Sequence, residues 1–241
     1  MSRRESVSVL DAGDGMFKTH VHLDDVQKVI KDELNTEAQL GPKTKYTVIG
    51  DGNGFMSRVV HVEPDWTVND ENLPKNFVLK INSAQHVHTY VKKLKDSWVD
   101  LITPEQEAAI WDMLEGESKM LHNREVNMLK ILKKWNRKDD ILNPDFYFSL
   151  KFDDSNPLKG FMGMEMIENS TVHHIYQNAT PEELYPVLKA LATLQALSLD
   201  MTQEDIDSIQ GYSFKKLMGP MLNEKAHIIS IAAKQLKCFS L

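Results

Sequence analysis

The chain has 241 residues, of which 41% are hydrophobic and 26% charged, so it is long enough to bury a core and has the composition of a soluble globular protein. Its formal net charge of −7 at pH 7 argues against nucleic acid or an anionic membrane as the main partner. Cys238 is the only cysteine, which excludes an intrachain disulfide and suits a reducing cytosol. No signal peptide and no run of about 18 apolar residues is visible, so a cytoplasmic location is predicted.

Residues 1–39 are interpreted as a leader and an N-terminal helix. The first twenty residues or so are predicted to be loosely held. Apolar residues then recur near one face of a helix over residues 21–34, and Asp24 and Asp25 complement the helix dipole in its first turn. A Gly-Pro pair at residues 41–42 ends this part of the chain before the first strand.

Three short apolar runs follow, at residues 46–49, 55–62 and 77–81, and each is predicted to be a β-strand. A glycine-rich turn with the sequence GDGNG, residues 50–54, separates the first two. Such a cluster indicates first of all a hairpin turn. Its glycines would also let backbone N–H groups approach phosphate oxygens without a Cβ in the way. Both interpretations stay open at this point.

Lys80 interrupts the third apolar run, between Leu79 and Ile81. A charged side chain in such a run is rarely buried unpaired, so Lys80 needs a partner, and a phosphate or a carboxylate would serve. Beside a glycine-rich turn, its ammonium group would supply a point charge to the same phosphates. The three strands, the turn and this lysine are therefore predicted to form a phosphate-holding arrangement.

A long helical region is predicted after the third strand. The sequence TPEQ at residues 103–106 has the pattern of a capped helix start with proline at the first helical position. The helical pattern pauses at Gly116 and resumes in a second helix that carries Glu125. Taken alone, Glu125 is typical of a solvated carboxylate that pairs with a nearby lysine or arginine. His122 and Arg124 are expected at the surface.

Two apolar and aromatic runs, at residues 146–152 and 160–167, are separated by turn residues and are predicted to form a hairpin. This hairpin would complete a five-stranded antiparallel sheet.

Further helices are predicted in the C-terminal part. The sequence TPEE at residues 180–183 has the pattern of a capping box, and an apolar stripe runs along residues 184–197. Pro186 is expected to bend or restart this helix. Residues 202–209 are expected to add a turn of helix, and residues 223–239 a last amphipathic helix.

Four sequence stretches occur in a recognisable order: IGDGNGFMSRVV, NFVLKI, HNREVNMLKIL and GFMGMEMIEN. Together they resemble the nematode branch of the CHK-kinase-like family, which is related to ecdysteroid kinases, choline kinases and aminoglycoside phosphotransferases. The resemblance extends from about residue 40 to about residue 220. It implies an α+β fold, with a protein-kinase-like N-lobe of five antiparallel strands plus helices at residues 40–168 and a partial helical C-lobe at residues 169–241.

The resemblance also implies a nucleotide site with ATP as its cofactor. In this family a glutamate on the long helix reaches the strand lysine and fixes it for the phosphates, and these positions match Glu125 and Lys80. Residues 165–169 would be the hinge between the two lobes, and its backbone would hold the adenine. Met164 and Met166 would be able to line the adenine slot, although methionines in a strand are more often part of an apolar core. The residues expected to bind the cofactor are Gly50, Asp51, Gly52, Asn53, Gly54, Phe55, Ser57, Lys80, Glu125, Glu165 and Met166.

Family members take a catalytic aspartate from a His-Gly-Asp-x-x-x-x-Asn loop and Mg²⁺ ligands from a later motif. Neither motif is found, so no catalytic residue and no metal ligand is assigned, although Mg²⁺ is expected for the family. The chain is interpreted as a truncated family member, and the substrate of full-length relatives as a small-molecule alcohol that is sterol, choline-like or xenobiotic. A non-catalytic nucleotide-binding or interaction module is the alternative. Because the stripe at residues 184–197 would lack the helices that normally cover it, self-association through this helix is also expected.

Overall fold

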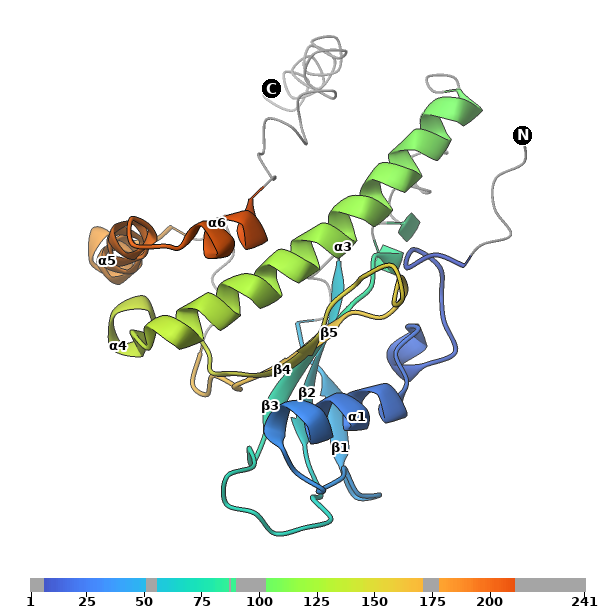
Figure 1. Cartoon of the computed structure of the whole chain (residues 1–241), viewed down its shortest axis with the longest axis horizontal. Helices are drawn as coiled ribbons and strands as arrows, with labels where there is room; N and C mark the ends of the chain where they lie inside the picture. The colour runs from blue at the N-terminus through green and yellow to red at the C-terminus, as the bar shows by residue number, and fades with distance from the viewer. Residues whose placement is uncertain (1–6, 51–55, 87, 90–102, 171–177, 211–241) are drawn as a thin grey trace, which may run out of the picture. The chain divides into compact units, whose positions relative to one another are not determined.

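The computed structural model of the chain describes residues 7–50, 56–86, 88–89, 103–170 and 178–210. The chain divides into two compact units, Met1–Asp200 and Met201–Leu241. In the first unit a sheet packs against helices (Figure 1). The second unit contains one described helix, α6 (Gln203–Ile209), whose N-cap Thr202 accepts a hydrogen bond from the backbone N–H of Asp205 at 3.1 Å. The helix expected over residues 223–239 lies outside the described residues.

The sheet has five strands: β1 (Lys45–Val48), β2 (Ser57–Glu63), β3 (Phe77–Asn82), β4 (Phe146–Leu150) and β5 (Phe161–Met164). Their order is β1-β2-β3-β5-β4, and every neighbouring pair is antiparallel. Each strand begins and ends within a few residues of the predicted run. The predicted α+β fold, with a five-stranded antiparallel sheet plus helices as in a kinase-like N-lobe, is therefore confirmed.

The two faces of the sheet pack against different helices, because successive strand side chains point to opposite sides. One face packs against α1 (Leu23–Leu34) and forms the main core with it. The opposite face carries Lys80 and Asn82 and contacts α3 (Pro104–Trp135), the long helix that crosses the strands in Figure 1. The buried members of the main core on the sheet and α1 are Val26, Ile30, Val60, Val62, Phe77, Leu79, Ile81, Phe148 and Phe161.

Helix α3 is one continuous helix of 32 residues, so the predicted pause at Gly116 is wrong. A glycine inside a helix costs about 1 kcal/mol relative to alanine. Contacts on both sides of Gly116 offset this cost: Glu115 and Lys119 form an ion pair at 2.6 Å across the glycine, and Trp111 and Val126 are buried before and after it. Tertiary packing thus carries the helix through a residue that local propensity disfavours.

The first described residues, 7–22, are folded against the rest of the unit, which corrects the expectation of a loosely held leader. Val9 and Leu10 are buried, and the backbone turns back on itself in a series of hydrogen bonds. A Cβ added to Gly13 or to Gly15 would lie 2.3 Å from a backbone oxygen of this turn. The turn therefore requires glycine at both positions, and the sequence DAGDG was its only local signal.

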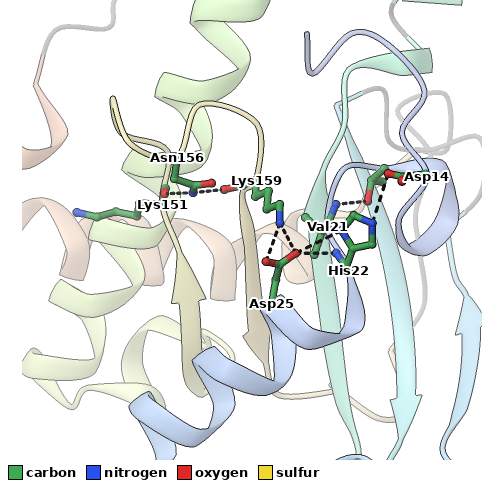
Figure 2. A network of polar contacts seen from close by, with 8 residues as sticks. Asp14, Val21, His22, Asp25, Lys151, Asn156 and Lys159 are labelled. Atoms are coloured by element: carbon green, nitrogen blue, oxygen red, sulfur yellow. Dashed lines mark hydrogen bonds and ion pairs between the residues drawn. The ribbon is translucent and has the colours of Figure 1, made fainter. Parts of the chain in front are cut away.

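An ion pair ties the β4–β5 connection to the start of α1 (Figure 2). Lys159 Nζ donates to both carboxylate oxygens of Asp25, at 2.7 and 2.8 Å. Asp25 also accepts a hydrogen bond from the backbone N–H of His22 at 2.8 Å. Asn156 closes the connection itself by donating to the carbonyl oxygens of Lys151 and Lys159. The predicted hairpin is thus present and is anchored to the helix on the other side of the core.

Helix α4 (Lys138–Ile141) precedes β4, and α5 (Pro181–Ser198) follows the sheet. Thr180 caps α5 as predicted, accepting a hydrogen bond from Glu183 N–H at 3.3 Å, but Pro186 lies within one uninterrupted helix and does not restart it. None of the described helices is long and apolar enough to span a membrane. Four large apolar side chains of α5 are between 46% and 62% exposed: Leu184, Val187, Leu188 and Leu191.

Candidate functional site

Lys80 and Glu125 form the charged centre of the candidate site. Lys80 Nζ donates to both carboxylate oxygens of Glu125, at 2.5 and 2.7 Å. The predicted contact between these two side chains is therefore present, although 45 positions separate them in the sequence. The side chain of Lys80 is 27% exposed and that of Glu125 is 41% exposed, so the pair remains open to solvent. A lysine ammonium has three donors, and Glu125 takes two of them.

The strand pattern explains why Lys80 faces the helix. Leu79 and Ile81 on either side of Lys80 are buried in the main core, so alternation places the lysine on the opposite face. In register, Lys80 lies between Val59 of β2 and Met162 of β5. On α3, residues at intervals of three or four share one face, and this spacing brings Ser118, His122 and Glu125 to the strand.

A cavity of about 200 Å³ lies beside the ion pair, between α3 and the ends of β2 and β3. Both charged side chains line it, so the cavity and the ion pair make one site. Six of the eight lining residues have polar side chains, so the cavity offers hydrogen-bonding groups to a ligand. The lining residues are Met56, Ser57, Lys80, Asn82, Ser118, Leu121, His122 and Glu125.

Asn82 and Ser118 join β3 to α3 at one wall of this cavity. Asn82 Nδ2 donates to the Ser118 carbonyl at 3.2 Å, and Ser118 Oγ donates to Asn82 Oδ1 at 3.1 Å. Both side chains are buried, so the reciprocal bonds satisfy groups that water does not reach. Sequence analysis missed this contact. Its signal was an amide at the end of an apolar strand, two residues after Lys80 and on the same face.

His122 was expected at the surface, and this expectation is wrong: the residue is 4% exposed. Its Nε2 lies 2.9 Å from the carbonyl oxygen of Leu150, which only accepts, so Nε2 carries the proton. Burial lowers the pKa of this imidazole below its ordinary value. The neutral ring forms part of the cavity wall one turn of α3 before Glu125. Arg124 is also partly buried.

The predicted phosphate-binding turn is described only at its edges. Gly50 has a φ of +66°, a conformation that favours glycine, and it is exposed. Ser57, the first residue of β2, pairs in register with Asn82 and lines the cavity. The remaining predicted residues of the turn lie outside the described residues, and they are Asp51, Gly52, Asn53, Gly54 and Phe55.

Glu165 and Met166, the predicted hinge residues, follow β5. The backbone N–H of Glu165 donates to the carbonyl of Asp145 at 2.8 Å, and its carboxylate accepts from Lys138 Nζ at 2.7 Å. The hydrogen bond from Lys138 lowers the pKa of the Glu165 carboxyl. These contacts engage Glu165 within the fold, while Met166 is partly buried. A nucleotide contact by either residue stays a prediction.

Apolar side chains continue from Lys80 toward these hinge residues on the same face of the sheet. Val59 is the neighbour of Lys80 in register, and Val78 pairs with Met164 of β5. Val59 and Met164 are partly exposed. The face therefore offers an apolar surface on one side of the ion pair and a polar cavity on the other.

Comparison with known protein families adds one finding. A family model described as "Uncharacterized oxidoreductase dhs-27" matches residues 9–238, which is almost the whole chain. The chain belongs to this family. No curated protein and no solved structure matches it.

In this member of the dhs-27 family, the chemistry of the site therefore follows from its geometry. It combines a half-buried ammonium group, a carboxylate that orients it, and a polar cavity lined by amide, hydroxyl and imidazole groups. Within the described ranges, no three His, Cys, Asp or Glu side chains cluster as metal ligands would. The ammonium group of Lys80 is the group of this site that can attract an anion.

Proposed function

We propose that this chain binds the phosphate groups of ATP through Lys80, with Glu125 orienting the lysine. The observation that carries the proposal is the short, bidentate contact between Lys80 Nζ and the Glu125 carboxylate at the mouth of a polar cavity. An ammonium held in this way keeps a donor for a phosphate oxygen and lies where its charge is only partly screened. The apolar face formed by Val59 and Met164 would take the base.

Membership of the CHK-kinase-like family is the finer inference that we draw from the same features. The antiparallel sheet, the lysine on its third strand and the glutamate on the following long helix occur in the chain order of a kinase-like N-lobe. For such a family the reaction would be phosphate transfer from ATP to the hydroxyl of a small molecule. Mg²⁺ would neutralise the charge on the transferring group, but we assign it no ligand among the described residues.

A dinucleotide is the other ligand class to weigh, since the family description names an oxidoreductase. Doubly wound dinucleotide-binding domains have parallel strands and a glycine-rich turn that leads from a strand into a helix. Every strand pair in the described sheet is antiparallel, and Gly50 lies in the connection between two strands. These features favour ATP over NAD(P)H as the ligand of this site.

Titration of the full chain with a fluorescent ATP analogue, with NADH as a competitor, tests the proposal. The substitution Lys80→Ala removes the charge and should weaken ATP binding by about tenfold or more, as expected for the loss of a charge-assisted hydrogen bond. Lys45→Ala is the matched control, because Lys45 also lies on a strand and pairs with a carboxylate, Glu63, but does so at the exposed surface at 3.7 Å. Unchanged binding by the Lys80→Ala variant, or tighter binding of NADH than of ATP, would overturn the proposal.

Turnover is a separate question, because the sequence holds no His-Gly-Asp-x-x-x-x-Asn motif. This observation favours the second candidate, a nucleotide-binding module without catalysis. Release of phosphate from ATP should then stay at background in a preparation that binds ATP. Phosphate release above background that disappears in the Lys80→Ala variant would instead identify the chain as an active phosphotransferase.

A further inference from the structure

Helix α3 is attached to the sheet by apolar contacts on either side of the site, while its middle part lies over the cavity. Beyond Glu125, Val126 packs with Phe146 and Met162. Toward its N-terminus, Trp111 packs with Ala84, two residues after β3, and with Leu10. Between these anchors, α3 lines the cavity, and polar contacts such as the one between Ser118 and Asn82 hold it to the sheet. The position of Glu125 over Lys80 therefore depends on both anchors.

The N-terminal anchor is made in part by the first described residues of the chain. Leu10 is buried in a cluster with Trp111. The ring of His88 packs edge to face on Trp111, with 4.7 Å between the ring centroids. Nδ1 of His88 also lies 3.1 Å from the carbonyl oxygen of Leu10. Next to this cluster, Ser8 Oγ donates to Glu115 Oε2 on α3 at 2.5 Å. Segments that are 107 positions apart in the sequence thus meet here.

The bond from Ser8 matters because the Glu115 side chain is buried. A carboxylate removed from water is stable only if donors replace the lost hydration. Ser8 supplies one donor and Lys119 Nζ, at 2.6 Å from Glu115 Oε1, supplies another. Loss of the serine hydroxyl would leave this buried oxygen with one donor fewer and favour a shift of the helix.

The other end of the same segment is fixed on the opposite face of the sheet. Val21 belongs to the main core together with Val26 of α1, and Gln85 Nε2 donates to the carbonyl of Lys18 at 2.5 Å. The segment therefore links the core beneath the sheet to the helix above it (Figure 1). It is anchored at both ends, as a positioning element must be.

We propose that residues 8–21, here called the N-terminal clamp, position α3 so that Glu125 reaches Lys80. Because α3 is continuous through Gly116, a displacement at Glu115 is transmitted over ten residues, about 15 Å, to Glu125. Ser8 and Leu10 are thus positioning residues for the ion pair. That the clamp controls a nucleotide site rests on the proposed function. Its effect on the ion pair can be measured without any nucleotide.

The experiment follows the chemical reactivity of Lys80 in the full chain. An amine-acylating reagent is added in limiting amount, and the rate of modification of each lysine is read from peptides by mass spectrometry. Ser8→Asp places a second carboxylate against Glu115 and should move α3, so that Lys80 loses Glu125 and reacts about fivefold faster or more, as expected for the loss of hydrogen bonds between charged groups. Ser8→Asp combined with Glu115→Gln removes the repulsion and should restore the slow rate.

Lys159 is the internal control, because it pairs with Asp25 on the other side of the core. A variant that simply unfolds would expose Lys159 as well as Lys80. If Ser8→Asp unfolds the protein, the test uses Ser8→Ala, which removes the hydrogen bond without adding charge. Faster modification of Lys80 alone, reversed in the double variant, supports the clamp. An unchanged ratio of the Lys80 rate to the Lys159 rate in both Ser8 variants would overturn it.

ATP titration of the same variants separates the two proposals. If wild-type protein binds no ATP but Lys80 still responds to Ser8→Asp, the proposed function fails and the clamp stands. If ATP binds through Lys80 while the reactivity of Lys80 is unchanged in both Ser8 variants, the clamp fails and the proposed function stands.

Discussion

At the scale of single residues, the site is maintained by polar contacts whose partners cannot be exchanged freely. Asn82 both donates to and accepts from Ser118, and neither aspartate nor leucine could do both. Asn82→Leu should therefore lower the free energy of unfolding by about 1–3 kcal/mol, the cost of removing the partner of the buried Ser118 hydroxyl. Urea unfolding measures the change, and Asn72→Leu in an exposed loop is the control, with little expected effect. Equal stability of the two variants would show that this contact does not hold α3.

His122 predicts a dependence of stability on pH. Burial lowers the pKa of its imidazole in the folded state below the ordinary value of 6.5, so the unfolded chain binds this proton more readily. The contribution of the neutral ring is thus fully present above pH 6.5 and is lost as the pH falls through 6.5 toward the lowered pKa. His122→Gln keeps a donor for the Leu150 carbonyl and should flatten the loss between pH 7 and pH 5 in urea unfolding curves. The same slope in wild type and variant would assign the pH dependence to a group other than His122. His22→Gln, which changes a side chain that is 46% exposed, is the control substitution.

At the scale of helices and strands, two glycines should respond to the same substitution with opposite signs. A Cβ at Gly116 on α3 would meet nothing within 4 Å, so Gly116→Ala should raise stability by about 0.5–1 kcal/mol through the better helix propensity of alanine. A Cβ at Gly163 on β5 would lie 2.3 Å from the ring of Phe148. Gly163→Ala should therefore destabilise the core by about 1–3 kcal/mol. Thermal unfolding of both variants tests the pair, and a loss of stability in Gly116→Ala would contradict the open space beside α3.

The ion pair between Asp25 and Lys159 tests how the hairpin is fastened to α1. Burial acts to raise the pKa of Asp25, but hydrogen bonds from Lys159 and from the N–H of His22 outweigh it and keep the pKa below 3.8. The contribution of the charged Asp25 to the stability of the fold is therefore present above pH 3.8 and is lost as the pH falls through the lowered pKa. A double-mutant cycle of Asp25→Asn and Lys159→Met should give a coupling energy of up to about 1 kcal/mol at pH 7, because solvent screens this partly exposed pair. A coupling that persists unchanged well below pH 3.8 would contradict an ionic origin.

The elements also show what local sequence can predict. The five strands and the cap at Thr180 were predictable, because they depend on alternation and on neighbours within a few residues. The same holds for Lys80, whose charge within an apolar run demanded a partner. The packed N-terminal segment was not predictable, since Ser8 makes its hydrogen bond to Glu115, which is 107 positions away. His122 was misplaced for a related reason: periodicity indicates that a helix has two faces, but the polar face met the sheet here.

At the scale of the whole molecule, the exposed apolar side chains of α5 lead us to expect self-association. Val187 and Leu188 are 62% and 60% exposed, and with Leu184 and Leu191 they form an apolar stripe on one helix. Contiguous exposed apolar surface of this kind favours association, because each side chain buried in a contact is removed from water. We expect the chain to self-associate through α5, with a sedimentation coefficient that rises with protein concentration. Leu188→Glu, which adds a charge to the stripe without touching the sheet, should abolish that rise. Thr193→Glu on the same helix is the control and should leave it in place, whereas association that is insensitive to Leu188→Glu would assign the contact to another surface.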